Sequence, residues 1–202
     1  MSFDSLNRIT AVVLAGGKSS RFGGRDKAFL KIDDMPMIEL VTGRLKKIFN
    51  GKIIVVTHSP EKYSSYRDFT IVEDIYREAG PLGGIHAAMT HANTGYIFVV
   101  SCDMPYLDKD IIRQQLNIFS SLTDADALIP RITSNIEPLH AIYRTAMAED
   151  LAGFLAATSN YSIRAFLENK NVAYFDLPGT LPERKAFSNI NRPDDLIDHI
   201  DI

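Results

Sequence analysis

The sequence predicts a three-layer α/β fold, in which helices cover both faces of a mostly parallel β-sheet. Short apolar runs rich in β-branched residues alternate with segments of helical periodicity, and they lie at 9–15, 52–57, 69–74 and 96–103. Continuous apolar runs of this length are typical of strands that are buried on both faces of a parallel sheet. The chain has 202 residues and no credible interdomain linker, so we expect residues 1–202 to form one domain.

The segment between the first two runs has the pattern of an amphipathic helix. Apolar residues recur on one face at Ile38, Val41, Leu45 and Ile48, with a proline near the start and a glycine past the end. Strand, helix, strand is the repeating unit of a three-layer α/β fold.

The second half of the chain predicts a change in the sheet. Asp108 is placed to cap a helix after the fourth run, and the segments 125–131 and 137–144 then have the pattern of further strands. We therefore expect a mixed sheet with an antiparallel element. The remaining predicted elements are helices near 145–157 and 162–170, a strand at 172–177 and a last helix after Pro193.

The composition excludes several classes of partner. The chain is 46% apolar and 23% charged, and its 22 basic and 25 acidic residues give a net charge of -3. The sequence has no stripe of basic residues that would predict binding to a nucleic acid or a membrane. The N-terminus lacks the apolar core of a signal peptide, and no apolar run approaches the ~18 residues of a membrane span. With its single cysteine, the chain is predicted to be cytoplasmic.

A glycine-rich loop, "LAGGKSSRFGGRDKA" at 14–28, follows the first predicted strand and contains the tripeptide Gly-Lys-Ser. A Walker loop would need its first glycine at position 12, which is Val12. The dinucleotide fingerprint also fails, because Gly16 and Gly17 are adjacent and neither has a glycine two residues on. The loop is therefore of another kind.

The residue types in this loop suit a polyphosphate. Glycines let the backbone approach a ligand and turn N–H groups inward, and several cations lie in the same short segment. A glycine-rich turn with solvated basic side chains is the alternative. The residues concerned are Gly16, Gly17, Gly23 and Gly24, with Lys18, Arg21, Arg25 and Lys27.

The loop resembles the nucleotidyltransferase signature of the molybdenum cofactor guanylyltransferase family, also called the molybdopterin-guanine dinucleotide biosynthesis protein A family. The segments that carry the resemblance are Leu14-Ala15-Gly16-Gly17, Ser20-Arg21-Phe22-Gly23 and Asp26-Lys27-Ala28, with Phe22 in place of the more usual methionine. The resemblance implies a Rossmann-like nucleotidyltransferase fold. It also implies that the N-terminal half binds GTP and that the C-terminal half binds molybdopterin.

Two acidic residues follow predicted strands. Asp103 lies just past a buried strand, where one carboxylate is enough for Mg²⁺ if phosphate oxygens and water supply the other ligands. Alone, it would be an ordinary turn residue. "CDMPYL" and "VEDIYREAGPLGGI" at 72–85 resemble family segments, which implies that Asp103 is the magnesium ligand and that Asp74 lies in the guanine nucleotide site.

The C-terminal half resembles the family at "EPLHAIYR", "SIRAFLE" and "FSNINRPDDL". By position these segments implicate Asn189 and Asn191, and also Arg164 and His140, in binding molybdopterin. Without the resemblance, the two asparagines would simply shape a turn before the last helix, and Arg164 would be a surface residue.

One segment departs from the family. An asparagine commonly follows the second strand there and contributes to nucleotide binding, whereas this chain has "VVTHSPEKY". Thr57, His58 and Ser59 are the candidates to replace it, and the sequence does not choose among them.

Cys102 and the histidines are not predicted to do chemistry. Cys102 belongs to an apolar strand with no base beside it, which favours a buried structural thiol over a nucleophile. His86 and His91 are five residues apart and off a shared helical face, so we assign no histidine to a metal.

The resemblance implies transfer of GMP from GTP to the terminal phosphate of molybdopterin, with or without bound molybdenum, and release of pyrophosphate. Further partners would be other cofactor biosynthesis proteins and molybdoenzyme chaperones. The alternatives are a cytidylyl- or sugar-phosphate nucleotidyltransferase, against which "GPLGGI" and "SNINRP" argue, and a non-catalytic guanine-nucleotide sensor. The predicted catalytic residues are Arg21, Lys27 and Asp103; the nucleotide-binding residues are Leu14, Ala15, Gly16, Gly17, Lys27, Asp74 and Asp103.

Overall fold

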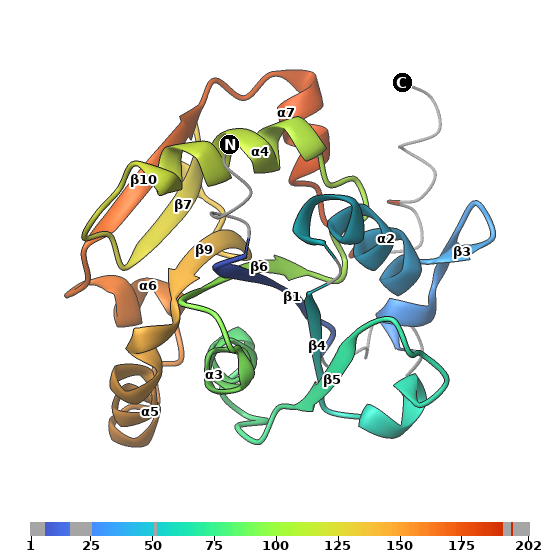
Figure 1. Cartoon of the computed structure of the whole chain (residues 1–202), viewed down its shortest axis with the longest axis horizontal. Coiled ribbons are helices and arrows are strands. Elements are labelled where there is room, and N and C mark those ends of the chain that lie inside the picture. Colours follow the sequence, from blue (N-terminus) through green and yellow to red (C-terminus); the bar gives the residue numbers. More distant parts are fainter. Residues whose placement is uncertain (1–6, 17–25, 51, 192–194, 196–202) are drawn as a thin grey trace.

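The computed structural model describes residues 7–16, 26–50, 52–191 and 195. They form a mixed β-sheet between two layers of helices, as predicted (Figure 1). The strands of this sheet are β1 (Ile9–Leu14), β4 (Ile53–Thr57), β5 (Thr70–Glu73), β6 (Tyr96–Ser101), β7 (Ala127–Ile132), β8 (Asn135–Ile136), β9 (His140–Arg144) and β10 (Val172–Leu177).

The strand order is β10-β7-β9-β6-β1-β4-β5, with β8 paired to β7. The half made of β6, β1, β4 and β5 is entirely parallel, with Leu14 opposite both Val56 and Ser101. Strand β9 runs antiparallel to both of its neighbours, β6 and β7, which confirms the predicted antiparallel element. The carboxyl ends of four parallel strands and the amino end of β9 therefore share one edge of the sheet.

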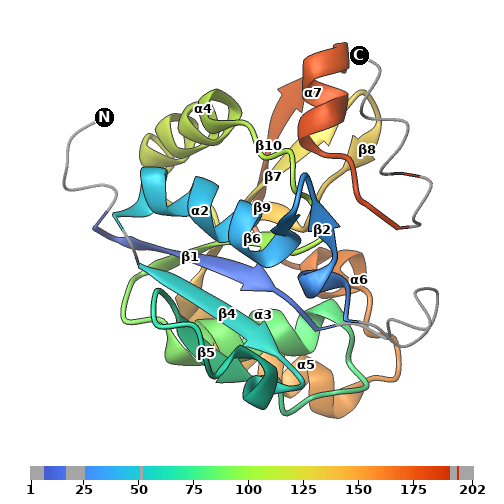
Figure 2. The ribbon, with the colours of Figure 1, turned by 90° about the vertical axis from the view of Figure 1, so that its right-hand side faces the viewer.

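Apolar side chains of the strands alternate between two cores. Val13, Val55 and Phe98 face the layer of α2, α4 and α7, whereas Val12 and Val99 face the layer of α3, α5 and α6. Figures 1 and 2 show these two layers above and below the sheet. The helices are α2 (Met37–Phe49), α3 (Pro81–His91), α4 (Lys109–Ser120), α5 (Ala148–Ala157), α6 (Ile163–Leu167) and α7 (Leu181–Ala186). Among the described residues, no helix is long and apolar enough to cross a membrane.

Two predicted helices form for the reasons that the sequence indicated. Helix α2 buries its apolar stripe and ends at Asn50, whose positive φ of 49° gives the left-handed cap that often closes a helix. Helix α4 begins where Asp108 accepts hydrogen bonds from the N–H groups of Asp110 and Ile111.

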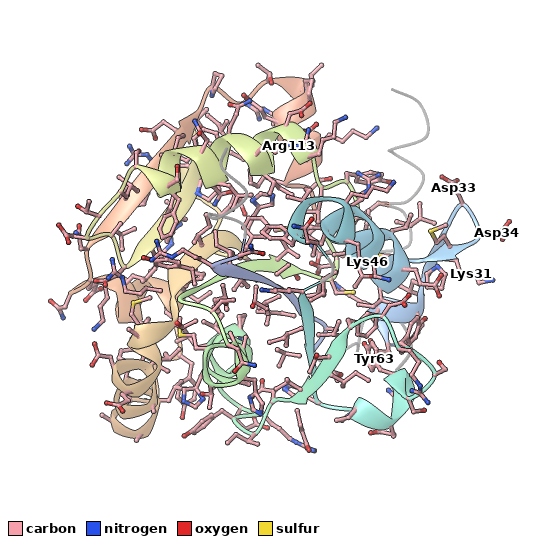
Figure 3. The ribbon with its side chains drawn as sticks, in the orientation of Figure 1. Lys31, Asp33, Asp34, Lys46, Tyr63 and Arg113 are labelled. Atoms are coloured by element: carbon pink, nitrogen blue, oxygen red, sulfur yellow. The ribbon has the colours of Figure 1, made fainter. Side chains whose placement is uncertain are left out.

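Several short or uniformly apolar elements were not predicted. The hairpin of β2 (Lys31–Ile32) and β3 (Met35–Pro36) has two-residue strands, too short to show alternation. Asp33 and Asp34 form its turn, both with positive φ, and Figure 3 shows them at the tip of the projecting hairpin. Helix α3 contains two glycines and is apolar on most sides, and α7 is only six residues long. The predicted helix after Pro193 lies outside the described residues, Asp195 excepted.

Candidate active site

The glycine loop leaves the sheet between two parallel strands. The N–H of Ala15 donates to Val56 O (2.8 Å), and the N–H of Cys102 donates to Leu14 O (3.0 Å). These bonds fix the predicted nucleotide-binding backbone of Leu14, Ala15 and Gly16 at the carboxyl edge of the sheet. Gly17 and Arg21 were also predicted to act here, and both lie outside the described residues.

The far end of the loop returns to the same edge through a short 3-10 helix, η2 (Lys27–Phe29). Asp26 caps it by accepting a hydrogen bond from the N–H of Ala28 at 3.2 Å. Phe29 packs against the buried ring of Tyr63, with 5.0 Å between ring centroids. Tyr63 (Figure 3) thus helps to hold the segment that positions Lys27.

Lys27, Asp103 and Asn191 meet at this edge, although they come from distant parts of the chain. Lys27 Nζ lies 3.2 Å from Asp103 Oδ2 and donates to Asn191 Oδ1 at 2.9 Å. The other oxygen of Asp103 accepts a hydrogen bond from Ser101 Oγ at 2.6 Å. The side chains of Lys27 and Asp103 are 24% and 19% exposed, so the cluster is open to a ligand.

The segment after α7 is tied directly to Asp103. The N–H of Ile190 donates to Asp103 O at 2.8 Å, and the N–H of Asn191 donates to Asp195 Oδ2 at 2.6 Å. Figure 2 shows this segment descending from α7. Ser101 was not singled out from the sequence, although its place two residues before Asp103 puts both side chains on one face of the chain.

The cluster supplies two oxygen ligands of the kind that Mg²⁺ prefers. Two oxygens, Asp103 Oδ2 and Asn191 Oδ1, converge on the ammonium group of Lys27, which already places a positive charge there. Within the described ranges, no three His, Cys, Asp or Glu side chains cluster closely enough to hold a metal ion. A cation here would therefore take its remaining ligands from phosphate oxygens and water, as Mg²⁺ commonly does.

Asp74 and His58 form a second polar group on the other side of the glycine loop. Asp74 is only 3% exposed; its Oδ2 lies 3.0 Å from His58 Nε2, and its Oδ1 accepts a hydrogen bond from the N–H of Tyr76 at 2.9 Å. Because a carboxylate only accepts, Nε2 of His58 carries the proton, and Nδ1 remains for another partner.

His58 lies beside the glycine loop, and Thr57 does not. A Cβ added to Gly16 would sit 3.4 Å from the His58 ring. Thr57 is buried, and its hydroxyl accepts a hydrogen bond from the N–H of Ser59 at 3.2 Å. Of the three candidates to replace the family asparagine, His58 has a side chain that lies against the loop backbone at Gly16.

The close packing around Asp74 depends on Gly83 in the first turn of α3. A Cβ on Gly83 would lie 2.7 Å from both Asp74 Oδ1 and Tyr76 O, far inside van der Waals contact. The carboxylate therefore rests against the first turn of α3, which is the positive end of the helix dipole. Burial lowers the pKa of neighbouring His86, while the charge of Asp74 opposes that shift.

The residues predicted to bind molybdopterin lie in different settings. Asn191 belongs to the Lys27 cluster, and Asn189 is exposed on the same segment. Arg164 is exposed in the first turn of α6. His140 is fully buried between the rings of Phe98 and Phe187, so its side chain is part of the core and does not join the cluster. A direct contact between His140 and a substrate is not supported by this position.

Cys102 is buried, in agreement with a structural thiol. Burial raises the pKa of the Cys102 thiol, with a further contribution from the nearby charge of Asp103. A thiol that stays protonated is a poor nucleophile.

Known proteins were compared with this chain and its fold. A family model described as a MobA-like NTP transferase domain matches residues 11–173. A probable molybdenum cofactor guanylyltransferase of Peptoclostridium acidaminophilum is 35% identical over 193 residues, which cover 93% of this chain and 86% of the relative. A protein of the same name from Clostridium perfringens is 35% identical over 195 residues, with 95% and 96% covered.

A solved structure agrees with the sequence relatives. The crystal structure of molybdopterin-guanine dinucleotide biosynthesis protein A from Archaeoglobus fulgidus matches with a TM-score of 0.76 and 29% identity, over 94% of this chain and 95% of that chain. The chain therefore belongs to the MobA-like NTP transferase family and, within it, to the molybdenum cofactor guanylyltransferases.

Proposed function

We propose that this protein transfers GMP from GTP to the terminal phosphate of molybdopterin, with or without bound molybdenum, and releases pyrophosphate. Membership of the family supports the reaction, because the relatives bear the name of that activity. The observation that carries the proposal is the meeting of Lys27, Asp103 and Asn191 at the end of the glycine loop.

The order of strands supports a division of the edge into two sides. Gly16, His58 and Asp74 follow β1, β4 and β5, on one side of Asp103. Strands β9 and β7 lie on the other side. We assign the first side to GTP and the second, with Asn189 and Arg164, to molybdopterin, so that Asp103 lies where the two substrates meet.

Bringing two anions together is the main electrostatic problem of this reaction. The acceptor phosphate, already ionised at neutral pH, attacks the α-phosphorus in line; the new phosphoanhydride bond forms as the bond to the β-phosphate oxygen breaks, and pyrophosphate leaves with its electron pair. No protein general base is needed. Lys27 offsets negative charge in the transition state, and the backbone N–H groups after Leu14 hold the nucleotide phosphates. Arg21 would add charge from the loop.

Asp103 and Asn191 would hold Mg²⁺ through their side-chain oxygens. When bound, the cation neutralises charge on phosphate oxygens in the transition state. Ser101 holds the other Asp103 oxygen and so fixes the carboxylate. We expect turnover to stop when EDTA removes divalent cations and to return when Mg²⁺ is added in excess.

His58 takes the place of the family asparagine in the nucleotide site. Its Nε2 is held by Asp74, and its ring borders the backbone of Gly16. In this arrangement Asp74 acts through His58, and Nδ1 of His58 accepts a hydrogen bond from the ribose or the base.

The test is pyrophosphate release with molybdopterin, Mg²⁺ and each of the four nucleoside triphosphates in turn. Turnover with GTP alone is expected. Turnover with CTP would point to a cytidylyltransferase, and turnover with a sugar phosphate in place of molybdopterin would point to the other nucleotidyltransferase class. Stoichiometric binding of GTP without pyrophosphate release would favour a non-catalytic sensor.

A further inference from the structure

Glu137 lies beside the reaction centre, on the side away from the glycine loop. The N–H of Ser101 donates to Leu139 O (3.1 Å), and the N–H of His140 donates to Glu137 O (3.1 Å). The N–H of Glu137 itself donates to Pro130 O at 2.9 Å. These bonds place the turn before β9 between the carboxyl ends of β6 and β7, next to the serine that holds Asp103.

The side chain of Glu137 is an acceptor whose hydrogen bonds are not met within the described part of the chain. It is half-buried, and among residues 7–16, 26–50, 52–191 and 195 no side chain or backbone N–H donates to its carboxylate. Burial raises the pKa of this carboxyl group, and the guanidinium of Arg164 on α6 opposes the shift. Half-buried carboxylates without donors are uncommon, because burial removes water that would otherwise hydrogen-bond to them.

A carboxylate at this place excludes some ligand groups and favours others. It repels phosphate, so it is not suited to the anionic parts of either substrate. Its two oxygens match two adjacent N–H donors on a planar ring. The aminopyrimidinone ring of a pterin presents such a pair, the ring N–H and the exocyclic NH₂. The guanine base presents the same pair, but we assign it to the side of β1, β4 and β5.

We propose that Glu137 is a specificity-determining residue for the acceptor, and that its two carboxylate oxygens accept hydrogen bonds from the amino edge of the pterin ring. This inference rests on the proposed function, since it names the residue that selects the acceptor in that same reaction. The charge of Arg164 favours the ionised form of Glu137, in which both oxygens are acceptors.

The kinetic test uses Glu137→Gln, which keeps the size of the side chain but replaces one acceptor oxygen with an NH₂ donor. We expect the KM for molybdopterin to rise about 10- to 100-fold, because the NH₂ group of the glutamine side chain would then face an N–H donor of the pterin ring. The KM for GTP should change by less than about twofold. Glu168→Gln is the matched control, since Glu168 is exposed just after α6, the helix that carries Arg164. A Glu137→Gln enzyme with both KM values unchanged would overturn the inference, as would a rise confined to GTP.

A binding test separates this inference from the proposed function. The fluorescence of 6-hydroxymethylpterin is titrated with the full chain, in parallel with the corresponding lumazine, which has an oxo group in place of the 2-amino group. We expect wild-type protein to bind the pterin at least tenfold more tightly than the lumazine, and Glu137→Gln to lose that preference. Equal binding of both rings by wild-type protein would contradict the inference even where GTP turnover is normal. Preference for the pterin without any turnover would support Glu137 and contradict the transferase.

Discussion

The ammonium group of Lys27 lies 3.2 Å from the carboxylate of Asp103, although 76 positions separate the two residues in the chain. Each belongs to a different strand connection, and the parallel arrangement of β1 and β6 brings them to one edge. Asn191 joins them from the C-terminal segment. The contact therefore links the glycine loop, the end of β6 and the C-terminal segment in one polar cluster.

Removing the charges of this pair should stop catalysis and leave the fold intact. We expect Asp103→Asn to abolish pyrophosphate release and Lys27→Ala to lower kcat about 10²- to 10³-fold. Because both side chains are partly exposed, the free energy of unfolding should change by less than about 1 kcal/mol. Asp110→Asn, an exposed change on α4, is the control. Near-normal kcat in Asp103→Asn would remove the metal assignment.

His58 and Asp74 should act as one unit in binding GTP. We expect His58→Ala and Asp74→Asn each to raise the KM for GTP about tenfold, because Asp74 fixes the ring that faces the loop. The double variant should be no worse than either single variant, which is the sign of strong coupling. His91→Ala serves as the control, as His91 is exposed at the end of α3. Additive effects of the two changes would show that Asp74 has a separate role.

The sequence predicted the sheet better than it predicted the contacts at its edge. Continuous apolar runs made β1, β4 and β6 recognisable, and capping by Asp108 made α4 recognisable, because both depend on local patterns. The pairing of His58 with Asp74 depends on strands β4 and β5 lying side by side, which no local pattern specifies. The burial of His140 was missed for a similar reason, since it requires Phe187, which directly follows a helix that was not predicted.

Two helical glycines should respond in opposite directions to substitution by alanine. Gly43 in α2 has nothing within 4 Å of an added Cβ, so Gly43→Ala should raise the free energy of unfolding by about 0.5–1 kcal/mol. Gly83→Ala would drive a methyl group into Asp74 and should lower the free energy of unfolding by about 1–3 kcal/mol. Chemical denaturation measures both. A stabilising Gly83→Ala would mean that α3 does not pack against Asp74 as described.

His140 should make the protein less stable in mild acid. Burial lowers its pKa from 6.5 to about 4, with the charge of Asp108 among the opposing influences. The unfolded chain therefore takes up a proton near pH 6.5 while the folded protein does not, so stability is complete above pH 6.5 and falls as the pH drops towards 4. The loss should reach about 3 kcal/mol.

The ring nitrogens of His140 have no hydrogen-bond partner within the described chain, so His140→Leu should remove this loss without destabilising the protein at pH 7.5. Urea denaturation of both proteins from pH 4.5 to 7.5 measures the difference, with His91→Ala as the exposed-histidine control. Parallel pH profiles for wild type and His140→Leu would contradict the prediction.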